Sequence, residues 1–169
     1  MPHHPQEGDL IFDFDYALNK PRTKFESKYL QTKTSIRPVD FLIELEELYR
    51  FVEVKDPDVP GANNVEKFQE EMASGEIIED LSRKFRDSHF FFINQCEDPK
   101  SIDYVVLICW KKLDPLHLPA LSERLRRTIP WTNGSYGDIS LRACVIMTLD
   151  KWKEEFGENS VWRESDFEE

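Results

Sequence analysis

The chain has 169 residues, a length that fits one domain with one sizeable hydrophobic core. The chain has 22 Lys and Arg against 33 Asp and Glu, a net charge of −11. If this negative charge were spread evenly over the surface, it would repel nucleic-acid phosphates. No run approaches the roughly 18 apolar residues of a membrane helix, and the opening Met-Pro-His-His-Pro lacks the basic and apolar regions of a signal peptide, so we expect a cytoplasmic protein without a membrane partner.

The charge is distributed unevenly along the chain. Residues 20–37 hold six bases and one acid, Glu26, whereas residues 150–169 hold eight acids and three bases. Because Lys and Arg bind phosphate by releasing counterions, the basic segment is a candidate for contact with a nucleic-acid backbone. A solvated helix face is the alternative interpretation. The bases of this segment that we assign to substrate binding are Lys28, Lys33 and Arg37.

Two segments after the basic stretch carry the period of two that is typical of β-strands. Apolar residues alternate through residues 40–45, which begin with Asp40, and through residues 51–55, which contain Glu53 and Lys55. Side chains at i and i+2 share a strand face, so Glu53 and Lys55 point the same way. A short polar turn separates the segments, and antiparallel pairing would bring Asp40 close to Glu53.

Two carboxylates and an amine that converge in this way suit the hydrolysis of a phosphodiester. Mg²⁺ takes oxygen ligands, usually one or two carboxylates with water and phosphate oxygens, and close carboxylates repel unless a cation or proton lies between them. A bound metal lowers the pKa of its water and polarises the phosphoryl oxygen. Lys55 would orient the attacking water or stabilise charge on the phosphate oxygens. We therefore expect Mg²⁺, or Mn²⁺ in its place, as the cofactor.

With the motifs Pro38-Val39-Asp40 and Glu53-Val54-Lys55, the chain resembles the PD-(D/E)XK, or restriction-endonuclease-like, nuclease superfamily. One hydrophobic residue is inserted between the proline and the aspartate. The expected order of elements over roughly residues 23–111, a helix, a strand pair, a helix and a strand, also resembles that superfamily's core. The resemblance implies that the two motif acids bind metal, that the lysine is catalytic, and that Glu26 of the first helix joins the metal. The alternative is structural, because Glu-x-Lys is a common solvated ion pair and aspartate is a common turn residue.

Past the motif, prolines predict a loop over residues 56–64, and residues 66–72 are expected to form a short helix. An amphipathic helix follows Gly75, with apolar residues recurring at three, four and seven positions. Its core stripe is expected to comprise Ile77, Ile78, Leu81, Phe85 and Phe92. The opposite side carries Arg83, Lys84, Arg86 and His89. The resemblance implies a basic side chain from this helix in the site, for which Lys84 is the candidate, with ordinary surface solvation as the alternative.

The remaining elements complete an α/β pattern. Residues 102–110 read as a central strand beside the motif strands, 118–129 as a helix, 141–148 as a buried strand and 150–156 as a short helix. Residues 131–137 are expected to form a loop whose two aromatics could stack on bases. We expect an acidic C-terminal tail over residues 158–169, and its last six residues, 164–169, are expected to be frayed.

Other classes of site have little support. The chain contains no Gly-x-Ser-x-Gly elbow and no phosphate-binding Gly-x-x-x-x-Gly-Lys loop, and its four histidines lack zinc-ligand spacing. Three cysteines without Cys-x-x-Cys spacing argue against a disulfide framework or a zinc ribbon. Cys109 and Cys144 lie in apolar runs, where cysteine acts as a small buried hydrophobe.

We therefore expect a single α/β domain over residues 1–169, with a restriction-endonuclease-like core at about 23–148 and a mixed sheet flanked by helices. The expected function is a Mg²⁺-dependent endonuclease acting on DNA, and the resemblance alone suggests a setting in defence or DNA processing. Cutting both strands commonly needs two subunits, so a homodimer or a larger complex is expected. The alternative is a non-catalytic acidic protein of the same fold that binds a basic partner, as an antidote or inhibitor would.

Overall fold

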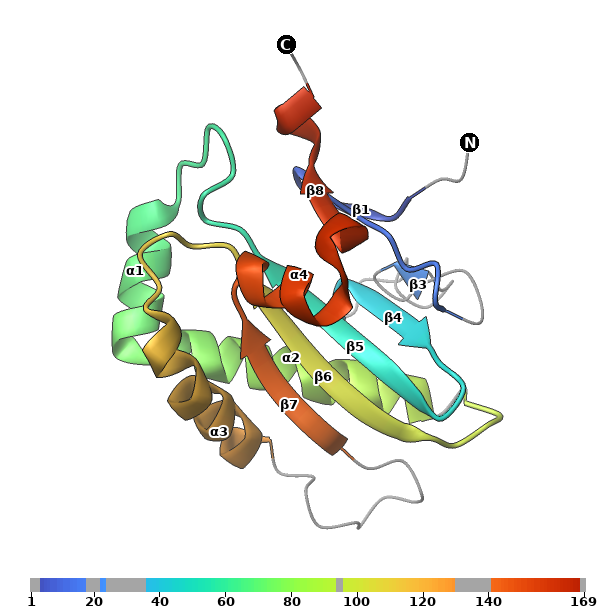
Figure 1. The fold of residues 1–169 in the computed structure, drawn as a ribbon. Coiled ribbons are helices and arrows are strands. Elements are labelled where there is room, and N and C mark those ends of the chain that lie inside the picture. Colours follow the sequence, from blue (N-terminus) through green and yellow to red (C-terminus); the bar gives the residue numbers. More distant parts are fainter. Residues whose placement is uncertain (1–3, 18–21, 24–35, 94–95, 130–140, 168–169) are drawn as a thin grey trace.

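The computed structural model describes residues 4–17, 22–23, 36–93, 96–129 and 141–167 (Figure 1). Its strands are β1 (Gln6–Glu7), β2 (Leu10–Phe12), β3 (Arg22–Thr23), β4 (Phe41–Glu44), β5 (Leu48–Lys55), β6 (Ser101–Ile108), β7 (Leu141–Met147) and β8 (Val161–Arg163). Its α-helices are α1 (Val65–Ser74), α2 (Glu76–Ile93), α3 (Leu118–Thr128) and α4 (Leu149–Phe156). Short 3-10 helices are η1 (Pro115–His117), η2 (Glu158–Ser160) and η3 (Glu164–Phe167).

A five-stranded mixed sheet forms the centre of the molecule, in the order β3-β4-β5-β6-β7. The pairs β3–β4 and β4–β5 are antiparallel, whereas β5–β6 and β6–β7 are parallel and are connected through α2 and α3. Figure 1 shows α2 behind the sheet and α4 in front of it, and α3 packs in the same part of the core as α2. The expectation of a mixed α/β sheet flanked by helices is confirmed, and the β-strands and α-helices between residues 41 and 156 lie where the sequence predicts them, apart from their ends.

The strand β5 is longer than predicted, because it begins at Leu48 rather than at Phe51. Its odd-numbered residues face α2, and two of them, Tyr49 and Phe51, are buried there and meet the ring of Phe92. These contacts stabilise the N-terminal half of the strand, which the shorter alternating pattern did not cover. The same alternation directs Glu53 toward α2.

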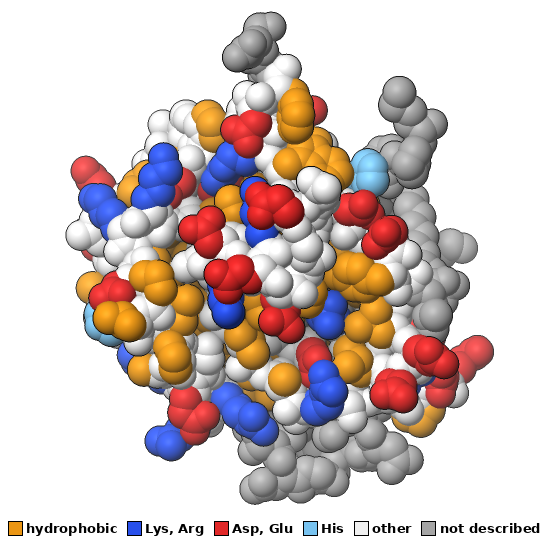
Figure 2. Space-filling view, viewed as in Figure 1, with side chains coloured by type: hydrophobic (Ala, Val, Ile, Leu, Met, Phe, Trp, Pro, Cys, Tyr) orange, Lys and Arg blue, Asp and Glu red, His pale blue; other side chains and the backbone are white. Residues whose placement is uncertain are grey.

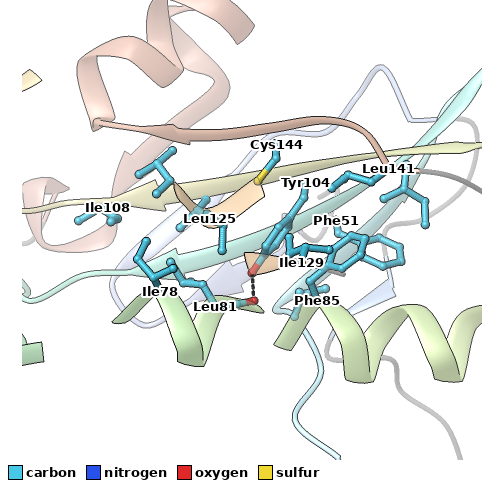
Figure 3. Close-up of a cluster of buried hydrophobic side chains, with 14 of the residues drawn as sticks. Phe51, Ile78, Leu81, Phe85, Tyr104, Ile108, Leu125, Ile129, Leu141 and Cys144 are labelled. Atoms are coloured by element: carbon cyan, nitrogen blue, oxygen red, sulfur yellow. Dashed lines mark hydrogen bonds between the residues drawn. The ribbon is translucent and has the colours of Figure 1, made fainter. Parts of the chain in front are cut away.

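The core has two parts, one on each face of the sheet. The larger part packs the sheet against α1, α2 and α3, and every residue predicted for the apolar stripe of α2 is buried in it. At its centre the hydroxyl of Tyr104 donates a hydrogen bond of 3.0 Å to the carbonyl of Leu81 (Figure 3). The smaller part packs α4, β2 and β8 on the other face. Cys109 and Cys144 are buried, one in each part, as expected.

The two ends of the chain form a second sheet that the sequence analysis did not predict. Its strand order is β1-β2-β8, with antiparallel pairing. The expectation of fraying over residues 164–169 is wrong for residues 164–167, which form η3, and residues 158–163 of the expected tail form η2 and β8. Val161 is 1% exposed, and Arg163 pairs with Asp9 and Asp56, so apolar burial and ion pairs anchor this segment.

None of the helices in the described residues is long and apolar enough to cross a bilayer. Two sequence-based expectations fall outside the described part of the chain. These are the first helix, expected around Glu26, and the aromatic loop at residues 131–137.

Candidate active site

The structure brings together Asp40, which immediately precedes β4, and Glu53 of the adjacent strand β5. Phe41 pairs with Val52, so one further step of the antiparallel register places Asp40 opposite Glu53. Asp40 lies just before β4, and its Oδ2 accepts a hydrogen bond of 2.8 Å from the backbone N–H of Val54. Both acids are buried, with exposed fractions of 5% for Asp40 and 1% for Glu53.

The two oxygens of the Glu53 carboxylate have different surroundings. Oε1 lies 2.5 Å from the Nζ of Lys84 and 3.5 Å from the Nζ of Lys55. Oε2 is buried and has no hydrogen-bond partner among the described residues. Burial, and then the negative charge of Asp40, raise the pKa of Glu53 to about 7, although Lys84 and Lys55 oppose the shift. The orphaned oxygen therefore presents a buried acceptor that suits a cation or a proton.

Lys55 occupies the same strand face as Glu53, and a second acid holds its ammonium group. Its Nζ donates a hydrogen bond of 2.9 Å to Oδ2 of Asp80 on α2, and Arg37 lies 3.6 Å from the other oxygen of Asp80. Burial lowers the pKa of Lys55, but the charges of Glu53 and Asp80 outweigh it and raise the pKa overall. Burial likewise raises the pKa of Asp80, and the bond to Lys55 and nearby cations lower it overall. Both groups are therefore charged at neutral pH.

Helix α2 supplies Asp80 and Lys84 from successive turns, because residues four apart share a helix face. Sequence reasoning missed Asp80, although its spacing from Lys84 was the signal that could have found it. Placing Lys84 and His89 on the helix side opposite the core was wrong. The Lys84 side chain is 19% exposed and reaches a buried carboxylate, and His89 is 2% exposed and stacks on Phe85.

The same helix holds the segment that precedes Asp40. The backbone N–H of Val39 donates a hydrogen bond of 2.8 Å to the hydroxyl of Ser88, and the N–H of Arg37 donates one of 3.0 Å to Asp87. Residues 37–40 are thus fixed against α2 before the chain enters β4. This anchoring positions one motif relative to the other, in addition to the pairing of the strands.

A cavity of about 510 Å³ opens at the carboxyl end of β5. Four of the charged residues described above line it, and the loop after β5 and helix α1 supply much of the rest of the lining. The four are Arg37, Lys55, Asp80 and Lys84. Asp40 and Glu53 do not line the cavity, because the two lysines lie between it and Glu53. Four bases and four acids line the cavity, so its walls carry both signs of charge, and of the lining residues it is Lys55 and Lys84 that lie against Glu53.

The residues present fit a hard divalent cation. Two neighbouring carboxylates and one unpartnered buried oxygen are the donor chemistry that Mg²⁺ prefers. The described residues contain no group of three or more His, Cys, Asp or Glu placed to hold a metal. Protein ligands would thus be limited to Asp40 and Glu53, with water and phosphate oxygens completing the shell, as is usual for Mg²⁺. Three other residues assigned to the site, Glu26, Lys28 and Lys33, lie outside the described residues.

Comparisons with models of protein families, with curated proteins and with solved structures returned no match. A functional interpretation of this chain therefore depends on the chemistry and geometry of the site.

Proposed function

We propose that the protein is a Mg²⁺-dependent endonuclease that hydrolyses DNA phosphodiester bonds on a restriction-endonuclease-like core. One observation carries the proposal. Asp40 and the orphaned oxygen of Glu53 lie buried beneath two ammonium groups at the edge of a cavity. Buried like charges are costly unless a cation or proton neutralises them, and such arrangements are concentrated at functional sites.

The residues divide the chemistry of hydrolysis between them. A divalent cation at Asp40 and Glu53 would polarise the phosphate and activate water. The water oxygen forms a bond to phosphorus, the bond from phosphorus to the leaving sugar oxygen breaks, and a proton from water ends on that oxygen. Lys55, held by Asp80, stabilises the negative charge that grows on the phosphate oxygens. Arg37 and Lys84 bind the neighbouring backbone from the cavity wall.

Cleavage assays with near-isosteric variants test the proposal. We expect nicking of plasmid DNA or cutting of single-stranded DNA with Mg²⁺ or Mn²⁺, and none in EDTA. The variants Asp40→Asn, Glu53→Gln and Lys55→Met should each lower the rate by about 100-fold or more, since they remove groups that act on the transition state. Lys100→Met is the matched control, because Lys100 pairs with Glu44 at 3.2 Å and does not line the cavity. This variant should cleave at the wild-type rate.

The proposal fails if the wild-type protein shows no metal-dependent cleavage, or if the variants of the three motif residues cleave as fast as wild type. Circular dichroism and cooperative melting of each variant separate a lost activity from a lost fold. A cleaving contaminant would be exposed by the second result, because its rate would not respond to substitutions in this chain.

The second candidate function is a non-catalytic acidic protein that binds a basic partner. The net charge of −11 favours it, as does the lack of a three-ligand metal group among the described residues. The face opposite α2, however, shows its described acidic side chains interspersed with basic and apolar ones rather than as one acidic field (Figure 2). Glu53→Gln and Lys55→Met distinguish the two functions, because a binder would keep its affinity for the partner.

A further inference from the structure

The path from the cavity to the acidic pair is closed by side chains of the protein itself. Asp40 and Glu53 are nearly inaccessible, and the side chains of Lys55 and Lys84 are only 21% and 19% exposed. Both ammonium groups approach the same oxygen of Glu53, at 3.5 and 2.5 Å. A divalent cation that arrives from the cavity therefore encounters two positive charges before it reaches its ligands.

We infer that Lys84 occupies the cation position beside Glu53 in the metal-free protein and moves into the cavity when a divalent cation binds. This inference rests on the proposed function, because it assumes a metal at Asp40 and Glu53. Lys84 is then a positioning residue with two places, one against the carboxylate and one toward the substrate. An ammonium and a divalent cation on one buried carboxylate repel each other, so the two compete.

Lys84, rather than Lys55, is the group free to leave. Lys55 has two acidic partners and lies closer to Asp80, at 2.9 Å, than to Glu53, at 3.5 Å. Lys84, by contrast, forms a salt bridge with Glu53 alone among the described residues. Asp80 lies one helical turn from Lys84, and the charge of Lys84 already lowers the pKa of Asp80. Asp80 therefore offers a second anionic partner along the cavity wall.

The exchange would couple metal binding to substrate binding. Once Lys84 leaves Glu53, its ammonium faces the cavity, where it attracts a phosphate. A phosphate in the cavity would in turn draw Lys84 away and favour the metal, because coupling between two bound ligands is reciprocal.

Titration with Mn²⁺ alone, followed through the electron paramagnetic resonance signal of the free ion, tests the competition. Lys84→Gln should bind Mn²⁺ about fivefold to tenfold more tightly than wild type, because the competing charge is gone. Lys84→Arg keeps the charge and should not bind more tightly. Lys67→Gln, which removes a cation that lines the same cavity but has a 73% exposed side chain and pairs with Glu71, should stay within twofold of wild type.

Asp40→Asn separates failure of this inference from failure of the proposed function. If Asp40→Asn abolishes Mn²⁺ binding but Lys84→Gln binds no more tightly than wild type, the inference is overturned and the metal site stands. If neither wild type nor Lys84→Gln shows binding that depends on Asp40, the proposed function is overturned and the inference with it.

A second measurement on the wild-type protein does not depend on the folding of any variant. An amine-acetylating reagent, with the products quantified by mass spectrometry, reports how accessible each lysine is. Saturating Mg²⁺ should increase acetylation of Lys84 several-fold and leave that of Lys67 unchanged. No increase at Lys84, at Mg²⁺ concentrations that saturate the site, would show that its ammonium stays on Glu53.

Discussion

The carboxylate of Asp40 accepts a hydrogen bond of 2.8 Å from the backbone N–H of Val54, the residue that separates Glu53 from Lys55. The bond joins the first motif to the middle of the second, so the two acids are held at a fixed distance. It also leaves Asp40 with a structural role in addition to the role proposed in metal binding. Stability and activity can therefore respond differently to substitutions at this position.

The side chains of asparagine and alanine separate these two roles. Asp40→Ala removes the acceptor and leaves the N–H of Val54 buried without a hydrogen-bond partner. It should therefore lower the free energy of unfolding by about 1–3 kcal/mol. Asp40→Asn keeps an acceptor and removes the repulsion with Glu53, so its stability should equal or exceed that of wild type. Urea denaturation in EDTA measures the free energy of unfolding of both variants. Equal losses of this free energy in the two variants would show that the hydrogen bond contributes nothing to stability.

The buried carboxyl of Glu53 gives the metal-free protein a pH dependence of definite sign. Burial, and then the charge of Asp40, raise its pKa from 4.5 to about 7, so between these values the folded protein holds a proton that the unfolded chain releases. The contribution of this group to stability is therefore greatest below pH 4.5 and is lost as the pH rises through about 7. A shift of this size corresponds to roughly 3 kcal/mol.

Comparing the unfolding of wild type and Glu53→Gln in EDTA from pH 5 to pH 8 separates the contribution of Glu53 to stability from that of other titrating groups. The free energy of unfolding of wild type should fall relative to that of the variant as the pH rises. A difference that stays constant over this range would mean that Glu53 titrates near its ordinary pKa.

Local periodicity predicted much of the sheet and part of the site. The alternation around Glu53 placed its side chain and that of Lys55 on one face, and pairing of adjacent strands then brought Asp40 to them. Those relationships depend on residues close in sequence, which is why they could be read from it. The contribution of α2 to the site was harder to predict from the sequence. Asp80 and Lys84 reach the site only because of the way in which α2 packs across the sheet.

The terminal sheet could not be predicted in the same way. Its strands are two or three residues long, too short to show a period, and β2 pairs with β8 across most of the chain. The C-terminal residues were expected to form an acidic tail, and charge patterns carry no information about the distant partners that hold them. The segment is anchored by the burial of Val161 and by Arg163, whose two acidic partners lie far from it in sequence.

Arg163 should therefore matter for stability far more than an ordinary surface arginine. It donates hydrogen bonds of 2.7 and 2.9 Å to Asp56 and one of 3.2 Å to Asp9, and its side chain is 17% exposed. Arg163→Met leaves two largely buried carboxylates without a cation, and we expect a loss of about 3 kcal/mol in the free energy of unfolding. Arg163→Lys should recover only part of it, because lysine lacks the bidentate geometry.

Arg127→Met is the control, since Arg127 is 79% exposed and pairs with Glu123 one helical turn away. Its loss should stay below about 0.5 kcal/mol in the same urea titration. Similar losses for the two methionine variants would mean that the terminal sheet is not held by the ion pairs of Arg163.

The reactivity of the three thiols should follow their burial. Burial raises the pKa values of Cys109 and Cys144 to about 12, so neither forms the reactive thiolate in the folded protein near neutral pH. Cys96 is only partly buried, and its thiol donates a hydrogen bond of 3.0 Å to the carbonyl of Asp98. Iodoacetamide at pH 8 should therefore alkylate Cys96 in the native protein and the other two only after denaturation, as mapped by mass spectrometry. Alkylation of Cys144 at the rate of Cys96 would show that the packing of α3 on β7 opens without global unfolding, because Cys144 lies in the core beneath that helix.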